Sequence, residues 1–278
     1  MHKKSLNLYR DEYEIGQEYG VLSNIENSKA YLDIFQTGYE YLDRYSDIKP
    51  YSHNTITINT KTKYINASPI NIQKDKYFIS TQGPKPETIE DFWTMVYDYK
   101  SNIIIMLCNI KEGGRRKCEN YWETKMQKFE VKVEKEDKKD MYVIRTIKLK
   151  NLENKEERQV YQIHFTAWPD HGIPDTSDGK VFVAFREINK CVDKLNTNGN
   201  PIIVHCSAGV GRTGTFISMY FLEKEILYQI ENKFDVIRIN IFNLVRKLKE
   251  MRLYMVQASV QYQFVYLFVQ YLLDTINV

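Results

Sequence analysis

Cysteine is scarce in this sequence, and neither sign of charge is in large excess. The 278 residues include only four cysteines, which do not suggest a disulfide framework in a chain of this length. The 39 basic and 36 acidic residues leave a formal net charge of +3, which is too small to argue for a nucleic-acid partner. We therefore expect free thiols and no binding of nucleic acid.

Long apolar runs are missing as well. The most apolar stretch, residues 264–273 (FVYLFVQYLL), is interrupted by tyrosine and glutamine and is too short to span a bilayer, so it predicts a packed helix. The basic N-terminus is followed by charged residues and not by the apolar core of a secretory signal. Without repeats or a long linker, the chain predicts one domain over residues 26–278, preceded by a loosely held arm over residues 1–25.

Apolar periodicity divides the chain into short strands and longer helices. Strands are expected at 55–59, 64–66, 77–81 and 101–108, with two or three antiparallel strands between 129 and 165. Helices are expected at 28–41, from Pro86 onward, and at 177–195, 212–230, 237–250 and 259–275. This order predicts an α/β (α+β) domain in which helices flank a mixed sheet and fill the C-terminal third.

The most specific pattern is a glycine-bearing loop, residues 204–214 (VHCSAGVGRTG), between an apolar strand and a helix. Successive N–H groups in such a loop, with the positive end of the helix dipole, form a cradle for anions. Cys206 is expected to carry a nucleophilic thiolate there, and Arg212 can bind two phosphate oxygens as a planar fork. The loop predicts phosphoryl chemistry, although Cys-x5-Arg spacing alone also arises by chance around a core cysteine.

Two further segments fit the same chemistry. Residues 168–174 (WPDHGIP) form a loop with stiff joints that carries Asp170, a carboxylic acid able to protonate a departing oxygen. Gln257 and Gln261 are four residues apart and share one face if the segment is helical, where a neutral amide can orient a water molecule. Taken singly, an ordinary turn aspartate and two solvent-facing glutamines would explain these residues equally well.

Other short segments precede these motifs in a fixed order: 44–48 (RYSDI), 64–68 (YINAS), 81–84 (TQGP), 91–93 (DFW) and 117–122 (KCENYW). From about Arg44 to Tyr271 the chain therefore resembles the cysteine-based protein tyrosine phosphatases. Segments 114–118 and 252–257 lean toward the receptor-type catalytic domains of that family. The resemblance implies a highly twisted mixed sheet flanked by helices, and hydrolysis of phosphotyrosine in proteins through a cysteinyl-phosphate.

The resemblance also implies roles for single residues. Cys206 would be the nucleophile, Asp170 the general acid and then the general base, and Arg212 the phosphate ligand. Thr213 would offer its hydroxyl to the sulfur, and Gln261 would position the hydrolytic water with Gln257 beside it. The phosphate would also be bound by the backbone of the loop residues Ser207, Ala208, Gly209, Val210 and Gly211.

Further residues would support or shape this site. In the family, an aromatic residue at the Tyr45 position walls the cleft, and an aspartate at the Asp47 position binds the substrate backbone. The supporting residues would be His205, Trp168, Glu112 and Lys117, the last two steadying Arg212 and Asp170. A solvated basic turn is the alternative interpretation of the segment between Glu112 and Lys117. Tyr254 stands where some members have glycine.

Three alternatives remain beside an active tyrosine phosphatase. A sulfurtransferase or arsenate reductase shares the Cys-x5-Arg spacing but does not need the Trp168 loop. A dual-specificity or lipid phosphatase usually lacks the Tyr45–Asp47 segment and Gln261. A catalytically inactive phosphotyrosine-binding module typically loses the cysteine, the aspartate or the arginine, and all three are present here.

The expected setting follows from the thiol chemistry. Cys206 has to stay reduced, which argues for a cytoplasmic, reducing compartment. The expected partners are tyrosine-phosphorylated proteins, and no cofactor, metal or membrane span is expected. The chain is expected to act as a monomer.

Overall fold

The computed structural model describes residues 11–30, 34–35, 38–73 and 76–276. The strands are β1 Ala67–Gln73, β2 Lys76–Thr81, β3 Ile103–Met106, β4 Lys111–Glu112, β5 Arg115–Arg116, β6 Thr124–Lys125, β7 Phe129–Lys138, β8 Tyr142–Asn151, β9 Glu157–Phe165 and β10 Ile202–His205. The α-helices are α1 Glu12–Ala30, α2 Ile89–Asp98, α3 Lys180–Leu195, α4 Gly211–Glu231, α5 Ile241–Met251 and α6 Ser259–Thr275, with short 3-10 helices η1 Glu40–Leu42 and η2 Pro86–Thr88.

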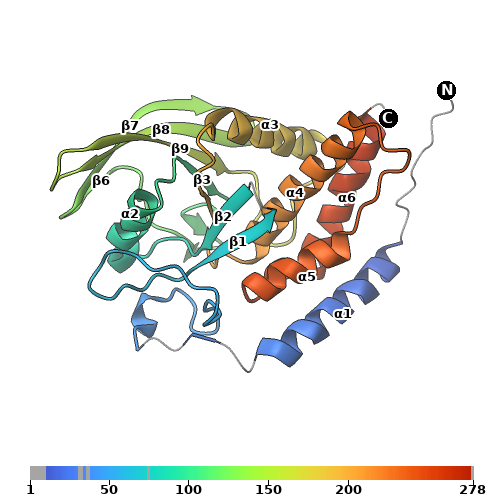
Figure 1. The fold of residues 1–278 in the computed structure, drawn as a ribbon, viewed down its shortest axis with the longest axis horizontal. Coiled ribbons are helices and arrows are strands. Elements are labelled where there is room, and N and C mark those ends of the chain that lie inside the picture. Colours follow the sequence, from blue (N-terminus) through green and yellow to red (C-terminus); the bar gives the residue numbers. More distant parts are fainter. Residues whose placement is uncertain (1–10, 31–33, 36–37, 74–75, 277–278) are drawn as a thin grey trace.

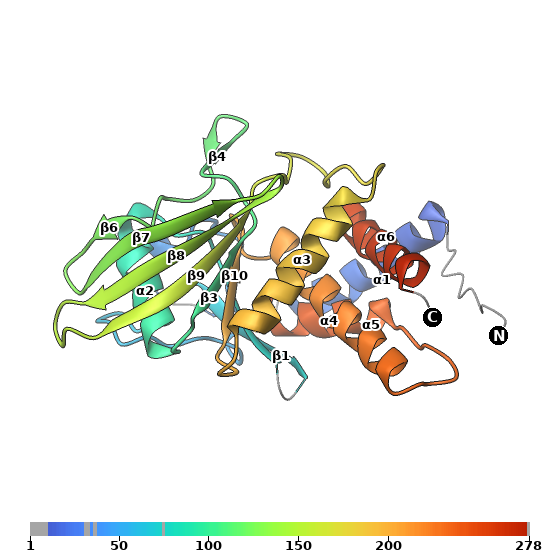
Figure 2. The same ribbon diagram turned by 90° about the horizontal axis from the view of Figure 1, so that it is seen from above.

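A mixed sheet runs through the middle of the molecule, with its strands in the order β1-β2-β10-β3-β9-β8-β7-β6 (Figure 1). The four central strands, β2, β10, β3 and β9, are parallel to one another, and all other pairs in this sheet are antiparallel. Helix α2 covers one face of the twisted sheet, and α3 to α6 cover the other (Figure 2). This arrangement confirms the expected helix-flanked mixed sheet.

Strand β10 places the candidate loop. All of its residues are buried, because it lies between two parallel neighbours and has helices on both faces. Its last residue, His205, pairs with Thr81 of β2 and Met106 of β3. The chain then leaves the carboxyl edge of the sheet and enters α4 at Gly211. The apolar run before Cys206 therefore fixes the loop at the end of a buried central strand.

Most expected elements are present, and the errors lie near the N-terminus. Strands β7, β8 and β9 form the expected antiparallel set, and α6 has the expected bounds. The strands expected at 55–59 and 64–66 are wrong, since only an isolated bridge joins Thr57 to Tyr64 there. Strand β1 instead begins at Ala67 and pairs with β2.

The first helix lies earlier than expected. Helix α1 ends at Ala30, whereas the sequence favoured a helix over 28–41, of which residues 31–33 and 36–37 lie outside the described part. The side chains that α1 buries, Ile15, Leu22 and Glu26, form a narrow stripe that gives little apolar periodicity. The helix also crosses residue 25, where the division between arm and domain stays a prediction, and residues 1–10 are not described.

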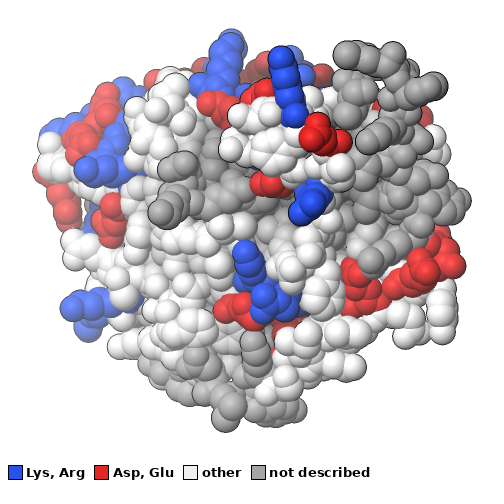
Figure 3. All heavy atoms as spheres, turned by 45° about the vertical axis from the view of Figure 1, so that its right-hand side comes forward, with Lys and Arg blue, Asp and Glu red and all other residues white. Residues whose placement is uncertain are grey.

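The described surface carries no long apolar element. Within the described ranges, none of the helices combines the length and the apolar character needed to cross a bilayer. On the face shown in Figure 3, most basic and acidic side chains lie next to each other in small groups among uncharged residues.

Candidate active site

The loop between β10 and α4, residues 206–211, is called the phosphate loop below. Its thiol is buried, and the N–H of Gly209 donates a hydrogen bond to the Cys206 Sγ at 3.3 Å. Gly209 has a φ of +73°, and a Cβ there would lie 2.1 Å from the carbonyl oxygen of Thr81. Only glycine fits this position, which explains one glycine of the motif.

An arginine for which the sequence predicts no role lies behind the loop. Arg252 is fully buried and donates through Nε to the carbonyl of Gly209 at 3.0 Å and through Nη2 to that of Ala208 at 3.2 Å. Its Nη2 also donates to Asn66 Oδ1 at 2.7 Å. Burial lowers the pKa of Arg252 to about 10, so it stays charged at neutral pH. Arg252 thus binds the carbonyl groups on the outer side of the phosphate loop, while the N–H of Gly209 points to the Cys206 sulfur.

His205 supports the loop from the sheet side. Its Nδ1 lies 3.0 Å from the carbonyl oxygen of Cys206, which can only accept, so Nδ1 carries the proton. Its Nε2 then accepts from the Tyr121 hydroxyl at 2.7 Å, and that hydroxyl accepts from Gln162 Nε2 at 2.8 Å. Burial lowers the pKa of His205 to about 4. A neutral, fully bonded imidazole fits the expected supporting role.

Arg212 is held in place by Glu112 on β4. The guanidinium donates through Nη1 and Nη2 to the two carboxylate oxygens at 2.7 and 2.9 Å, and through Nη1 to the Leu107 carbonyl at 3.1 Å. Burial disfavours its charge, but the Glu112 hydrogen bonds and nearby negative charge outweigh this and raise the pKa of Arg212. Among the described residues, Nε has no protein partner, which leaves it free for a substrate oxygen.

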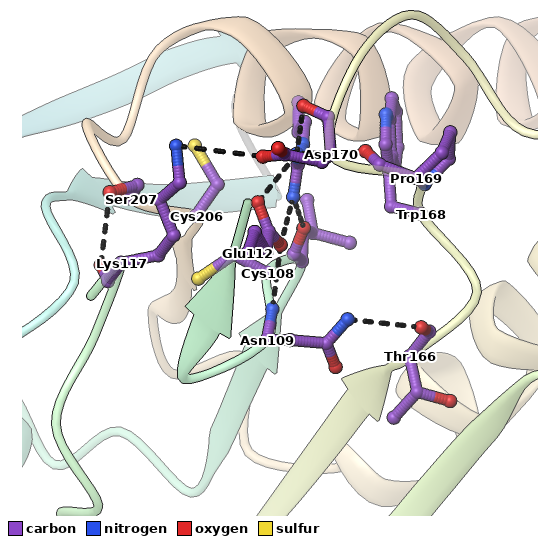
Figure 4. A network of polar contacts seen from close by, with 12 residues as sticks. Cys108, Asn109, Glu112, Lys117, Thr166, Trp168, Pro169, Asp170, Cys206 and Ser207 are labelled. Carbon is purple, nitrogen blue, oxygen red and sulfur yellow. Dashed lines mark hydrogen bonds and ion pairs between the residues drawn. The ribbon is translucent and has the colours of Figure 1, made fainter. Parts of the chain in front are cut away.

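The Asp170 loop lies over the site. Arg212 Nη2 donates to the carbonyl oxygen of Pro169 at 3.0 Å and contacts that of Asp170 at 3.4 Å. The Asp170 carboxylate lies 3.8 Å from Lys117 Nζ, and the two side chains point toward each other in Figure 4. A Cβ on Gly113 would lie 2.1 Å from Asp170 Oδ2, so this glycine makes room for the acid.

Trp168 anchors the base of that loop. Its ring is buried against Phe185 and Phe264, at centroid distances of 6.1 and 5.9 Å. Its Nε1 donates to the Gly172 carbonyl at 3.2 Å, which closes the turn around Asp170. Trp168 therefore fixes one end of the loop, and its expected supporting role stays a prediction.

The mouth of the site is walled by an aromatic residue. The Tyr45 hydroxyl lies 2.9 Å from Ser207 Oγ, which itself donates to the Lys117 carbonyl at 3.0 Å, so Tyr45 is the donor to Ser207. Asp47 is exposed at the rim. These contacts tie Tyr45, which lines the cavity, directly to the phosphate loop.

One expectation needs correction. Helix α6 begins at Ser259, so Gln257 precedes it and does not share a helical face with Gln261, although both side chains line the cavity. Thr213 Oγ1 is buried without a hydrogen-bond partner in the described part of the chain, and its expected help to the departing sulfur stays a prediction.

These residues enclose one cavity of about 380 Å³. The predicted residues that line it are Tyr45, Asp47, Glu112, Lys117, Asp170, Cys206, Ser207, Ala208, Gly211, Arg212, Gln257 and Gln261. The predicted residues that are not among its lining residues, all of them buried, are Trp168, His205, Gly209, Val210 and Thr213. Ile48, His171 and Gly172 also line it, without a predicted role.

Comparison with known proteins agrees with this site. The model of the protein-tyrosine phosphatase family matches residues 40–271. Mouse receptor-type tyrosine-protein phosphatase eta is 39% identical over 231 residues, which are 80% of this chain and 18% of that protein. Rat tyrosine-protein phosphatase non-receptor type 20 is 36% identical over 247 residues, which are 84% of this chain and 56% of that protein. The chain thus spans less than two thirds of these relatives.

A solved structure shares the fold over nearly the whole chain. The catalytic domain of human protein tyrosine phosphatase non-receptor type 18 superposes with a TM-score of 0.83 at 26% identity. The alignment covers 94% of this chain and 96% of that domain. The chain belongs to the protein-tyrosine phosphatase family.

Proposed function

We propose that this chain hydrolyses phosphotyrosine in proteins through a cysteinyl-phosphate intermediate. The observation that carries the proposal is the single cavity in which the Cys206 sulfur, the Arg212 guanidinium and the Asp170 carboxylate converge. A nucleophile, an anion ligand and a proton donor are the groups that this reaction needs. The names of the similar proteins support the same activity.

In the first step the Cys206 thiolate attacks phosphorus in line with the bond to the tyrosine oxygen. As the S–P bond forms and the P–O bond breaks, Asp170 gives its proton to the departing phenolate oxygen. The Arg212 Nε–H and the loop amides bind the phosphoryl oxygens while charge develops on them. Because Glu112 fixes the guanidinium beforehand, little reorganisation is needed during the reaction.

In the second step a water molecule, oriented by Gln261 with Gln257 beside it, attacks the phosphorus. Asp170 now accepts the water proton, the S–P bond breaks, and inorganic phosphate leaves while Cys206 returns to the thiolate. The expected aid from Thr213 requires its unpartnered hydroxyl to turn toward the sulfur.

The walls of the cavity support selectivity for phosphotyrosine. Cys206 is buried, and Tyr45 stands at the mouth, so a short phosphoserine or phosphothreonine would not bring its phosphorus to the sulfur. This argues against the dual-specificity alternative. The exposed Asp47 is placed to bind a peptide backbone. A structure of the type 18 phosphatase in complex with phosphorylated HER2 peptides exists, and by analogy the partners here are tyrosine-phosphorylated proteins.

The cysteines also bear on the compartment in which the protein acts. The four cysteines are unpaired, and Cys206 must stay reduced to react, which favours a cytoplasmic location. We propose a monomer, because the site draws its residues from one chain. Sedimentation of the purified protein checks this.

The test is turnover of a phosphotyrosine peptide by the wild-type chain and by Cys206→Ser. The wild type should release phosphate without added metal and in the presence of a chelator. Cys206→Ser should lose turnover but still bind the peptide, because the loop amides and Arg212 remain. Cys191→Ser on α3 is the matched control and should keep full activity. A chelator-sensitive rate, or turnover by Cys206→Ser, would contradict the proposal.

A further inference from the structure

The chain segment 252–256, called the backing segment below, runs directly behind the phosphate loop. Arg252 binds the carbonyls of Ala208 and Gly209, and the N–H of Val256 donates to the Val210 carbonyl at 3.3 Å. Consecutive carbonyls of the loop are therefore held by this one segment.

The backing segment has an unfavourable backbone conformation. Tyr254 has a φ of +62° and Val256 a φ of +56°, the left-handed region that favours glycine. A β-branched residue such as Val256 is a clear outlier there. Such residues keep this conformation only when their surroundings hold them. Contacts from outside the segment must therefore fix it.

Helix α1 supplies those contacts, although it lies outside residues 40–271 that match the family. Glu26 Oε1 accepts from the N–H of Tyr254 at 2.5 Å, and the Tyr19 hydroxyl donates to the Val256 carbonyl at 3.1 Å. Glu26 is fixed in turn by Lys249 of α5, whose Nζ donates to Oε2 at 2.8 Å with both side chains buried. The two residues in the left-handed region are thus the two that α1 binds.

The geometry makes these contacts persistent. Burial raises the pKa of Tyr19 to about 12, so the hydroxyl keeps the proton that it donates. Helix α1 lies along α5 and α6 (Figure 1), and Tyr262 and Tyr266 of α6 both donate to its Glu18. The helix is therefore attached independently of the backing segment.

The residue after the backing segment faces the substrate. Gln257 lines the cavity directly after Val256, and Gln261 lines it from the first turn of the next helix. The Gln261 side chain also accepts from the N–H of Ala258 at 3.3 Å. The direction of the Gln257 side chain is thus set by the backbone that Tyr19 holds at Val256.

We propose that Tyr19 and Glu26 of α1 are positioning residues for the hydrolysis of the cysteinyl-phosphate. They hold the backing segment in the conformation that presents Gln257 and Gln261 to the attacking water. The inference rests on the function proposed above. It adds to that function a role for helix α1, which lies outside residues 40–271 that match the family.

Tyr19→Phe tests the inference, because it removes one hydroxyl and leaves the packing of the ring. Rapid-quench kinetics with an aryl phosphate resolve both steps. We expect an unchanged rate of phenol release in the burst and a hydrolysis step about fivefold slower, the effect of losing one hydrogen bond. The trapped cysteinyl-phosphate should rise at steady state. Tyr266→Phe, which removes an α1–α6 hydroxyl contact of the same kind, should change neither step.

Two outcomes would overturn the inference while leaving the proposed function intact. One is an unchanged rate of the hydrolysis step in Tyr19→Phe. The other is a slowing of both chemical steps to the same extent in Tyr19→Phe and in Tyr266→Phe, which would indicate general destabilisation. Glu26→Gln gives a second test, since the amide oxygen can still accept from Tyr254 but the ion pair to Lys249 is lost. It should slow the same step. Failure of the proposed function would instead appear as a wild type without turnover.

Discussion

The carboxylate of Glu112 binds the guanidinium of Arg212 at two points, with distances of 2.7 and 2.9 Å. The pair is mostly removed from solvent, with 4% of the Glu112 side chain and 13% of the Arg212 side chain exposed. The N–H of Asn109 holds the same carboxylate at 2.8 Å. The plane of the guanidinium is therefore set before substrate arrives, by a residue 100 positions away in the chain.

The first prediction concerns this pair. Glu112→Gln keeps the size of the side chain but removes its charge, so Arg212 keeps fewer fixed contacts and binds phosphate in more than one orientation. We expect kcat/KM for a phosphotyrosine peptide to fall roughly 10- to 100-fold, the effect of losing a charged hydrogen bond. Glu157→Gln is the control, because its pairs with Lys148 and Lys150 are exposed. Equal activity of both variants would remove Glu112 from this role.

The second prediction separates the proton donor from the rest of the site. Asp170→Ala should slow turnover of a phosphotyrosine peptide by roughly 10²- to 10⁴-fold, because the phenolate leaves without a proton. The loss should be much smaller for an aryl phosphate whose leaving group is a weak base. Comparison of kcat on the two substrates measures this difference. Asp175→Ala, an exposed aspartate of the same loop, should leave both rates unchanged, and an equal loss on both substrates in Asp170→Ala would refute the acid role.

The third prediction concerns the buried arginine behind the phosphate loop. Arg252→Met leaves four acceptors without their donor, including the carbonyls of Ala208 and Gly209. We expect the free energy of unfolding in urea to fall by at least ~2 kcal/mol. Arg246→Met removes a half-exposed pair with Glu250 on α5 and should lower it by less than ~1 kcal/mol. Similar losses in the two variants would show that Arg252 does not support the loop.

Local patterns explain what could be predicted from the sequence. The loop around Cys206 depends on a buried strand, glycines and a helix start that are adjacent in the chain. All three can therefore be recognised within one short segment of the sequence. Helix α6 has the expected bounds for the same reason. The positions of Asp170 and Gln261 over the loop came from the family resemblance, because single residues in separate segments carry no signal of contact.

The missed features depend on distant contacts. Arg252 donates hydrogen bonds to Asn66 Oδ1, 186 positions away in the chain, and to the carbonyl of Gly209, 43 positions away. A single sequence does not reveal contacts between residues so far apart. The conformations of Tyr254 and Val256 oppose their own preferences, so tertiary contacts decide them. Helix α1 buries too narrow a stripe to show helical periodicity, and its place follows from packing on α5 and α6.

Two buried histidines make stability depend on pH. Burial lowers the pKa of His164 and of His205 to about 4. Above pH ~6.5, the value in the unfolded chain, neither state binds these protons and the full stability is present. Between pH ~6.5 and 4 the unfolded chain binds protons that the folded chain excludes, so the free energy of unfolding falls as pH falls.

The fourth prediction is that His164→Gln flattens this dependence. Each histidine contributes a slope of up to ~1.4 kcal/mol per pH unit in that window, so the variant should lose one such contribution. Asp91, whose pKa burial raises to about 6, acts in the opposite direction, so only the difference between variant and wild type isolates the histidine. Urea unfolding at several pH values measures it, with His171→Gln at an exposed position as the control. If the free energy of unfolding of the variant had the same slope against pH as that of the wild type, His164 would be protonated in the folded chain. Only in that case would unfolding of the wild type take up no proton at this residue.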